Sequence, residues 1–166
     1  MCHYSTEGFL IGIFYKNNAY LIRHISTDIF RCGTCLYSDG TGTDYGENWN
    51  YNGCAFYNST NILNVTGSGH DLFFNSCSFD YSTYIFKLIS TASVFLNNCH
   101  IEYPHTVQDS FCYVQGNEGY LDIDNSVLLG GGTHTSTSRA GYCDNGHISI
   151  SNTKIHGFCN TVSLSY

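Results

Sequence analysis

The sequence predicts an all-β solenoid, a fold in which successive coils of the chain stack on one another. Three observations indicate this fold. The composition suits strands and turns, an apolar pattern recurs at a nearly constant interval along the chain, and the segments between the recurrences lack helical periodicity. We expect about five to six coils of 22–29 residues within one domain.

The composition favours strands joined by tight turns. Charged residues make up 11% of the chain, so solubility must come from neutral hydrogen-bonding side chains. The 14 Tyr and 11 Phe suit a pleated surface, and the 17 Gly supply turns.

Four segments repeat one pattern without gaps: HDLFFNSCSFDYS at 70–82, ASVFLNNCHIEYP at 92–104, GYLDIDNSVLLGG at 119–131 and GHISISNTKIHGF at 146–158. With an earlier segment they align into four columns. The columns are Trp49, Leu72, Val94, Leu121 and Ile148; Tyr51, Phe74, Leu96, Ile123 and Ile150; Cys54, Cys77, Cys99, Ser126 and Thr153; and Phe56, Phe79, Ile101, Leu128 and Ile155. Every interval within the last column falls in the range of about 20 to 50 residues that is typical of a solenoid.

Each coil is predicted to contain a strand, a bend and a second strand. Leu72 and Phe74 are two residues apart and mark a strand with one inward face, and the longer step to Cys77 marks the bend. The bend residues should adopt left-handed backbone and hydrogen-bond along the stack; they are Gly53, Ser76, Asn98, Asn125 and Asn152. A third, less regular strand is marked by Leu63 and Val65, Phe86 and Leu88, Cys112 and Val114, and Val162 and Leu164.

The regular coils occupy residues 46–166, and residues 1–45 are predicted to form one or more irregular coils of the same solenoid. In the segment NAYLIRHIST, the residues Tyr20, Ile22 and Ile25 have the same mutual spacing as Trp49, Tyr51 and Cys54, which suggests an earlier coil in which they align in that order. The segment CNTVSLSY still has the pattern of a third strand, so we expect the regular coils to continue in a longer chain or to stack on another chain.

Two solenoid families share parts of this pattern. A leucine-rich repeat matches Leu72, Phe74, Cys77 and Phe79, but its preceding Leu position holds Gly46, Gly69, Thr91, Glu118 and Asn145. From residue 46 onward the pattern instead resembles the right-handed parallel β-helix of pectate lyases and bacteriophage tailspikes. The resemblance implies triangular coils with three short parallel strands and a carbohydrate site on the outward face of one sheet. It also implies a homotrimer, as is typical of tailspikes.

Charge and composition exclude several functions. A net charge of −7 repels phosphate backbones and anionic lipid surfaces, so we expect no nucleic-acid partner. No apolar run approaches membrane-spanning length, so we expect no membrane insertion. Nine cysteines, an odd number, favour assembly in a reducing cytoplasm.

The candidate catalytic residues lie on the outward face of the second strand. If Cys77 and Phe79 point inward, Ser78 and Asp80 point outward, and in the next coil His100 and Glu102 do the same. Stacked carboxyls repel each other, so one can act as a general acid while the other stays ionised, as glycoside hydrolysis requires. The alternative is a solvated pair that is screened by water and eased by His100. Carboxyl spacing, and hence a nucleophile or a water mechanism, stays open.

The surroundings suggest a carbohydrate ligand. Tyr81, Tyr84 and Tyr103 follow the second strand and offer flat apolar faces with hydroxyl groups, and Ser78 adds another hydroxyl. The longer segments YPHTVQDSF and GGGTHTSTSRAGY either wall a groove or are solvated decorations or subunit contacts. In a lyase variant, His100 would be the base and Tyr81 or Tyr103 the acid, but basic residues that would bind a uronate are scarce.

We expect no metal and no other cofactor. Cys54, Cys77 and Cys99 are predicted to be buried thiols in one column, and the Cys32–Cys35 pair lacks partners for a zinc site. Three functions remain. The first is a phage tailspike module, located in the virion tail after assembly in the host cytoplasm, that binds and cleaves a bacterial surface polysaccharide with Asp80, Glu102 and His100. The second is a receptor-binding or structural fibre module without catalysis, and the third is a cellular polysaccharide lyase or epimerase.

Overall fold

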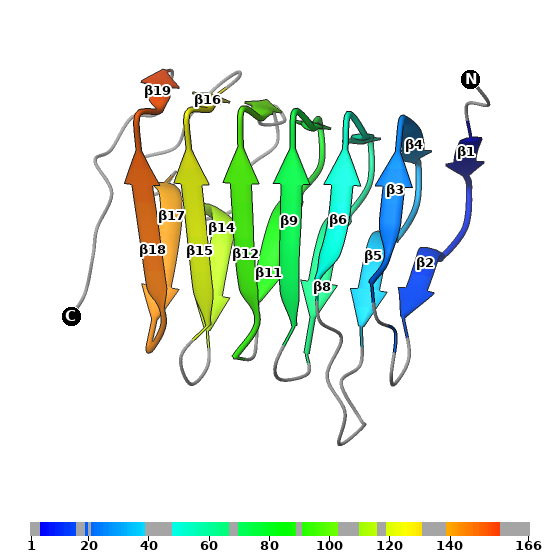
Figure 1. The fold of residues 1–166 in the computed structure, drawn as a ribbon, viewed down its shortest axis with the longest axis horizontal. Coiled ribbons are helices and arrows are strands. Elements are labelled where there is room, and N and C mark those ends of the chain that lie inside the picture. Colours follow the sequence, from blue (N-terminus) through cyan, green and yellow to red (C-terminus); the bar gives the residue numbers. More distant parts are fainter. Residues whose placement is uncertain are drawn as a thin grey trace.

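The computed structural model describes residues 4–15, 19, 21–38, 48–66, 70–88, 91–102, 110–115, 119–130 and 139–156. Within these ranges the chain forms β-strands β1 to β19 and no helix. None of the described segments is therefore a helix that is long and apolar enough to cross a membrane. Strands from successive coils lie side by side along the long axis, from β1 at one end to β19 at the other (Figure 1).

All strand pairs are parallel and belong to three sheets. Sheet A has the order β1 (Tyr4–Glu7), β4 (Thr27–Phe30), β7 (Ala55–Tyr57), β10 (Ser78–Asp80), β13 (His100–Glu102), β16 (Val127–Leu129) and β19 (Lys154–His156). Sheet B has the order β2 (Ile11–Tyr15), β5 (Thr34–Ser38), β8 (Asn61–Val65), β11 (Tyr84–Leu88), β14 (Ser110–Gln115) and β17 (Arg139–Asp144). Sheet C has the order β3 (Arg23–Ile25), β6 (Trp49–Asn52), β9 (Asp71–Asn75), β12 (Ser93–Asn97), β15 (Tyr120–Asp124) and β18 (His147–Ser151).

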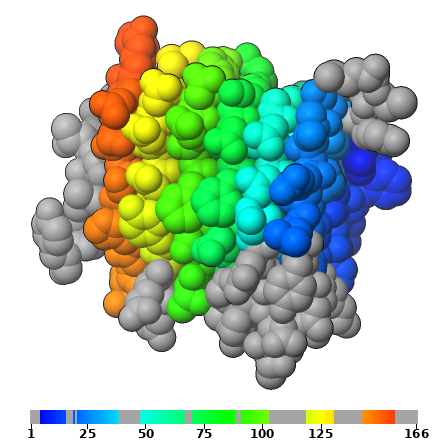
Figure 2. Space-filling view, in the orientation of Figure 1, coloured from blue at the N-terminus to red at the C-terminus, as the bar shows by residue number. Residues whose placement is uncertain are grey.

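This arrangement confirms the predicted all-β parallel solenoid. Along the chain, each strand of sheet A is followed by one of sheet B and then one of sheet C until the last, β19, so successive coils add one strand to each sheet. The leucine-rich-repeat alternative is wrong, because the described part of each coil has strands where that family places a helical segment. Figure 2 shows the coils as successive bands across one face.

The register confirms the aligned columns. In sheet C, Leu72 lies between Trp49 and Val94, and in sheet A, Phe79 lies between Phe56 and Ile101. In both sheets, the Cα partner of each residue therefore belongs to the coil before or after its own. Side chains at these positions stack directly, which is the condition for a continuous core.

The third strand is also as predicted in the central coils, where Phe86 lies between Leu63 and Cys112. The sequence pattern missed the strand β17, which falls partly in the segment GGGTHTSTSRAGY that was expected to form a loop. Residues 110 and 111 of the other predicted wall are likewise part of β14. Val162 and Leu164 lie outside the described residues.

The register proposed for the N-terminal coil is wrong by two residues. The sequence pattern aligns Ile22 with Tyr51, whereas the structure pairs His24 with Tyr51 and Ile25 with Asn52. Ile25 consequently points outward and is 61% exposed, although it was expected to fill the core. Tyr20 lies outside the described residues. The strands β1 to β5 join the same three sheets as the later strands.

The bend between sheets C and A has the predicted left-handed backbone. Its residues have φ values of 59° at Gly53, 53° at Ser76, 54° at Asn98, 47° at Asn125 and 46° at Asn152. The backbone N–H of each of the first four donates to a carbonyl of the next coil at 3.0–3.3 Å. Side-chain bonds along the stack include Asn98 Nδ2 to Ser76 Oγ at 3.0 Å. The bend is therefore repeated by hydrogen bonding from coil to coil.

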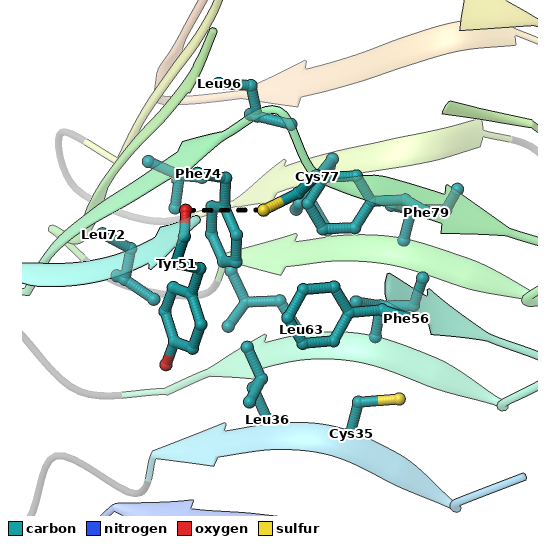
Figure 3. Close-up of a cluster of buried hydrophobic side chains, with 14 of the residues drawn as sticks. Cys35, Leu36, Tyr51, Phe56, Leu63, Leu72, Phe74, Cys77, Phe79 and Leu96 are labelled. Carbon is teal, nitrogen blue, oxygen red and sulfur yellow. Dashed lines mark hydrogen bonds between the residues drawn. The ribbon is translucent and has the colours of Figure 1, made fainter. Parts of the chain in front are cut away.

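The core lies between the three sheets and is rich in stacked aromatic rings (Figure 3). Tyr51 stacks on Phe74 with ring centroids 4.6 Å apart, and Phe56 stacks on Phe79 at 5.3 Å. The two stacks meet edge to face, with Phe74 and Phe79 at 5.2 Å. These geometries are the favoured ones for aromatic pairs, and the rings are fully buried.

The predicted column of buried thiols is confirmed for Cys54, Cys77 and Cys99, which are free cysteines. Each Sγ lies 3.4–3.6 Å from the carbonyl oxygen two residues earlier. The Cys77 thiol also donates to the Tyr51 carbonyl oxygen of the preceding coil at 3.4 Å (Figure 3). The thiols thus close the bend from inside while they fill the core as small apolar groups.

Candidate functional site

The candidate residues lie on two neighbouring strands of sheet A. Ser78 is the Cα partner of His100, and Asp80 is the Cα partner of Glu102. Between them, Phe79 and Ile101 point inward and are buried, so alternation turns the four polar side chains outward. The parallel register therefore brings Asp80, His100 and Glu102 together, although Asp80 belongs to one coil and the other two residues to the next.

His100 lies between the two carboxyl groups. Its Nε2 atom is 3.7 Å from Asp80 Oδ1 and 3.6 Å from Glu102 Oε2, beyond ordinary hydrogen-bond distance. One possible ligand atom from each of the three residues lies within 4.8 Å of the other two. The imidazole is 45% exposed, whereas the side chains of Asp80 and Glu102 are 22% and 32% exposed.

The two oxygens of Asp80 have different environments. Ser78 Oγ donates a hydrogen bond of 2.5 Å to Oδ2. The other oxygen, Oδ1, is buried and has no hydrogen-bond partner among the described residues. Burial raises the pKa of the Asp80 carboxyl, and the charge of Glu102 adds to this rise, whereas the Ser78 hydrogen bond and His100 oppose it. On balance, the surroundings of Asp80 therefore favour the protonated form of its carboxyl.

Glu102 is oriented by Tyr81. The Tyr81 hydroxyl donates to Glu102 Oε1 at 3.0 Å, which leaves Oε2 to face His100. The Tyr81 backbone has a φ of 51°, a left-handed conformation that is costly for a bulky side chain. This conformation occurs at the corner where the chain leaves β10, and the side chain contacts Glu102 of the next coil. The sequence pattern predicts Tyr81 only as a sugar contact and as the acid of a lyase, and does not predict this contact with Glu102.

The other predicted sugar contacts are not all at this site. Tyr84 lies on β11 in sheet B as the Cα partner of Asn61, around a corner from the carboxyl pair, and is half-buried. Tyr103 lies outside the described residues. Ser78 and Tyr81 are therefore the two described residues of that prediction that contact the carboxyl groups.

Sequence reasoning missed the aromatic side chains beside the pair. The Cα partner of Asp80 on the other side is Tyr57, whose own partner is Phe30. These two outward rings stack with centroids 4.7 Å apart and an interplanar angle of 3°. Arg31 lies 5.9 Å from the centre of the Phe30 ring and forms an ion pair with Glu7. The signal for Tyr57 was available, because it follows Phe56 as Asp80 follows Phe79.

The geometry gives little support to a lyase. Arg31 directly follows β4 and Lys154 begins β19, so each belongs to a strand two places away from the carboxyl pair. A uronate carboxylate held over His100 would thus face Asp80 and Glu102 without a Lys or Arg on β7 or β16, the adjacent strands of sheet A, both of which are fully described. In addition, the hydroxyl of the candidate acid Tyr81 is already bonded to Glu102.

Comparison with known proteins assigns the chain to no family. No protein-family model matches the sequence, and no curated protein or solved structure matches it. The strand register shows a parallel β-solenoid, and no comparison links this fold to pectate lyases or to tailspikes.

Proposed function

We propose that this chain binds a bacterial surface polysaccharide on the outward face of sheet A and hydrolyses it with Asp80 and Glu102. The observation that supports this proposal is the pairing of the two carboxyl groups as direct neighbours in register, with His100 between them. Like charges placed opposite each other in a sheet are unfavourable. A catalytic role for the two carboxyl groups would account for the presence of this arrangement. In keeping with the resemblance, we propose that the chain is a module of a trimeric phage tailspike.

Asp80 is assigned as the general acid and Glu102 as the nucleophile. Glu102 attacks the anomeric carbon while the glycosidic C–O bond breaks, and the Asp80 proton passes to the departing sugar oxygen. The Asp80 carboxylate then takes a proton from water, and the water oxygen displaces Glu102 from the anomeric carbon. One carboxyl oxygen of Asp80 and one of Glu102 lie within 4.8 Å of each other. This distance is closer to the carboxyl spacing of about 5–5.5 Å in retaining enzymes than to the wider spacing in inverting enzymes.

The surroundings favour a neutral polymer over an acidic one. The chain carries a net charge of −7, and the site itself contributes two carboxyl groups. An anionic polysaccharide would be repelled by this field, whereas neutral sugars can hydrogen-bond to the Ser78 and Tyr81 hydroxyls. The Phe30 and Tyr57 rings stack on each other beside Asp80 and add aromatic surface that a sugar can contact.

A non-catalytic receptor-binding module is the second candidate. The observation that favours it is that each carboxyl group already accepts an internal hydrogen bond, from Ser78 to Asp80 and from Tyr81 to Glu102. Such bonds also occur where charged groups only stabilise a surface. The two candidates differ in whether the polymer is shortened after it binds.

The test is reducing-end release from a panel of neutral and acidic capsular and O-antigen polysaccharides. We expect cleavage of a neutral polymer, and we expect Asp80→Asn and Glu102→Gln each to lower the rate by about 10²–10⁴-fold while binding is retained. The matched control is Asp122→Asn, which removes a carboxylate from the outward face of sheet C and should leave the rate unchanged. Binding without release would establish the receptor-binding module instead, and new products that absorb in the ultraviolet would establish a lyase.

A further inference from the structure

We propose that Asp80, His100 and Glu102 also form an open binding site for a transition-metal dication of the zinc class, and that the bound ion blocks the hydrolysis. The inhibition rests on the proposed function, whereas the binding does not.

The three candidate ligand atoms converge on one point in front of sheet A. Asp80 Oδ1 and Glu102 Oε2 lie 3.7 and 3.6 Å from His100 Nε2, and all three residues offer ligand atoms within 4.8 Å of one another. A tetrahedral ion with bonds of about 2.1 Å holds its ligands about 3.4 Å apart. The two contacts of His100 need to shorten by only a few tenths of an ångström. The carboxyl oxygens need to approach each other further, which a small rotation of the partly exposed Glu102 side chain about its hydrogen bond with Tyr81 would achieve.

The inner oxygen of Asp80 is a second observation that points to a cation. Within the described part of the chain, the buried Oδ1 has no hydrogen-bond partner, which is unfavourable for a buried acceptor. The atom faces Nε2 of His100 at a distance too long for a hydrogen bond. A cation between the two would satisfy both lone pairs at once.

The outer oxygens are held as in an organised metal site. Ser78 Oγ donates to Asp80 Oδ2, and Tyr81 donates to Glu102 Oε1, so each carboxyl turns its other oxygen toward His100. Hydrogen bonds of this kind orient metal ligands and are needed for full affinity. One of the two donors lies on the same strand as Asp80, and the other lies at the corner after it.

The donor set selects the class of ion. Imidazole suits zinc, copper, nickel and iron, whereas calcium and magnesium prefer oxygen ligands alone. Three protein ligands with solvent on the remaining side match the coordination of an open zinc site. His100 and Glu102 are two residues apart on β13, and Asp80 comes from β10, so the rigid sheet sets their positions.

Ion binding and acid catalysis exclude each other here. A bound ion occupies the oxygen lone pairs that Asp80 needs for its proton and that Glu102 needs for attack on the anomeric carbon. The polysaccharide is therefore cleaved by the metal-free protein and not by the loaded one. Zinc bound to these three residues would inhibit the hydrolysis reversibly.

Isothermal titration of the chelator-treated chain with zinc chloride tests the binding. We expect a site that is lost in His100→Gln and weakened about tenfold or more in Ser78→Ala and Tyr81→Phe, because these two remove only the orienting hydrogen bonds. His147→Gln, on the exposed start of β18, is the matched control and should bind zinc like the parent chain. Cysteine-bound zinc would remain in every variant, so the difference between variants identifies the site.

The outcomes separate the two proposals. Equal zinc binding by the parent chain and His100→Gln would overturn the site, as would a preference for calcium over zinc. If zinc binds at the site but fails to inhibit cleavage of the polymer, the inference that zinc binding blocks hydrolysis is wrong. If zinc binds as expected and the metal-free chain cleaves no polymer, the metal site stands and the hydrolase proposal fails.

Discussion

The coils from β6 to β13 and those from β15 to β19 share one backbone geometry but fill it with different side chains. In the first region, Phe56, Phe74 and Phe79 are fully buried, and the inner bend column consists of cysteines. In the second region, the matching positions hold aliphatic residues, and the bend column continues as Ser126 and Thr153. Burial also declines, since Ile148 and Ile150 of β18 are only partly buried and Ile155 of β19 is 42% exposed.

The side chains that hydrogen-bond to the bend between sheets C and A differ between the two regions. Ser126 Oγ donates to the Asp124 carbonyl oxygen at 2.7 Å and also accepts from the backbone N–H of Cys99 at 3.0 Å. Thr153 repeats both contacts, toward Ser151 and Ser126. The thiols donate to the equivalent carbonyls at 3.4 Å or more, as weak donors. The inner side of the bend is thus bonded by weak thiol donors in the first region and by shorter hydroxyl hydrogen bonds in the second.

The largest expected effect breaks the aromatic stack. Phe74→Ala should lower the free energy of unfolding by about 3–5 kcal/mol, because it leaves a cavity between Tyr51, Phe56 and Phe79. The matching change in the second region, Ile150→Ala, should cost only about 1–2 kcal/mol because that side chain is partly buried. Urea unfolding followed by circular dichroism measures both. Equal losses would show that the two regions do not differ in core energetics.

A smaller effect sharpens the contrast in hydrogen bonding. Ser126→Ala should cost about 1–3 kcal/mol, because it leaves the buried Cys99 N–H without its partner and removes the shorter of the two hydrogen bonds that the Asp124 carbonyl accepts. The parallel change Cys99→Ala should cost about 1 kcal/mol, since it removes a weak donor and little volume. The same urea experiment compares them. A larger loss at Cys99 would mean that the thiol column is the stronger closure of the bend.

Much of this fold was visible in the sequence because in-register stacking repeats the same constraint in every coil. Phe56, Phe79 and Ile101 must all be apolar, and Ser76 and Asn98 must both tolerate left-handed backbone, so the columns show a pattern that no single coil would. The strand β17 was missed because the segment RAGYCD has little apolar alternation, and its pairing with β14 determines its structure.

The error at the N-terminal coil has a specific cause. Aligning apolar residues placed Ile25 in the core, yet the bend residue of that coil is Ser26, with a φ of 51° and a backbone bond to the Asn52 carbonyl oxygen. Aligning Ser26 with Gly53 would have produced the observed register. Small residues at a bend were thus a better guide to register than apolar ones.

The candidate site was accessible to sequence reasoning only in part. Strand alternation and the interval between coils place Asp80 next to Glu102. They do not determine which oxygen Ser78 or Tyr81 will bond, because this depends on side-chain rotamers and on the left-handed corner at Tyr81. Phe30 was missed for a different reason, since its position depends on the N-terminal register.

The smallest expected effect is on the pH dependence of stability, which should differ between the aromatic region around His24 and the rest of the chain. His24 stacks on Tyr51 with ring centroids 5.2 Å apart, and its Nε2 atom bonds to the Tyr15 hydroxyl at 2.8 Å. Burial lowers the pKa of His24 below its usual value, so the unfolded chain takes up a proton first as the pH falls. The contribution of His24 to stability is therefore full above about pH 6.5 and declines below it.

The variant His24→Gln tests this, because it retains an acceptor for Tyr15 without titrating. Its urea midpoint should fall less between neutral and mildly acidic pH than that of the parent chain. His156→Gln, on exposed β19, should leave that fall unchanged, and equal behaviour of the two variants would place the acid sensitivity outside the aromatic stack.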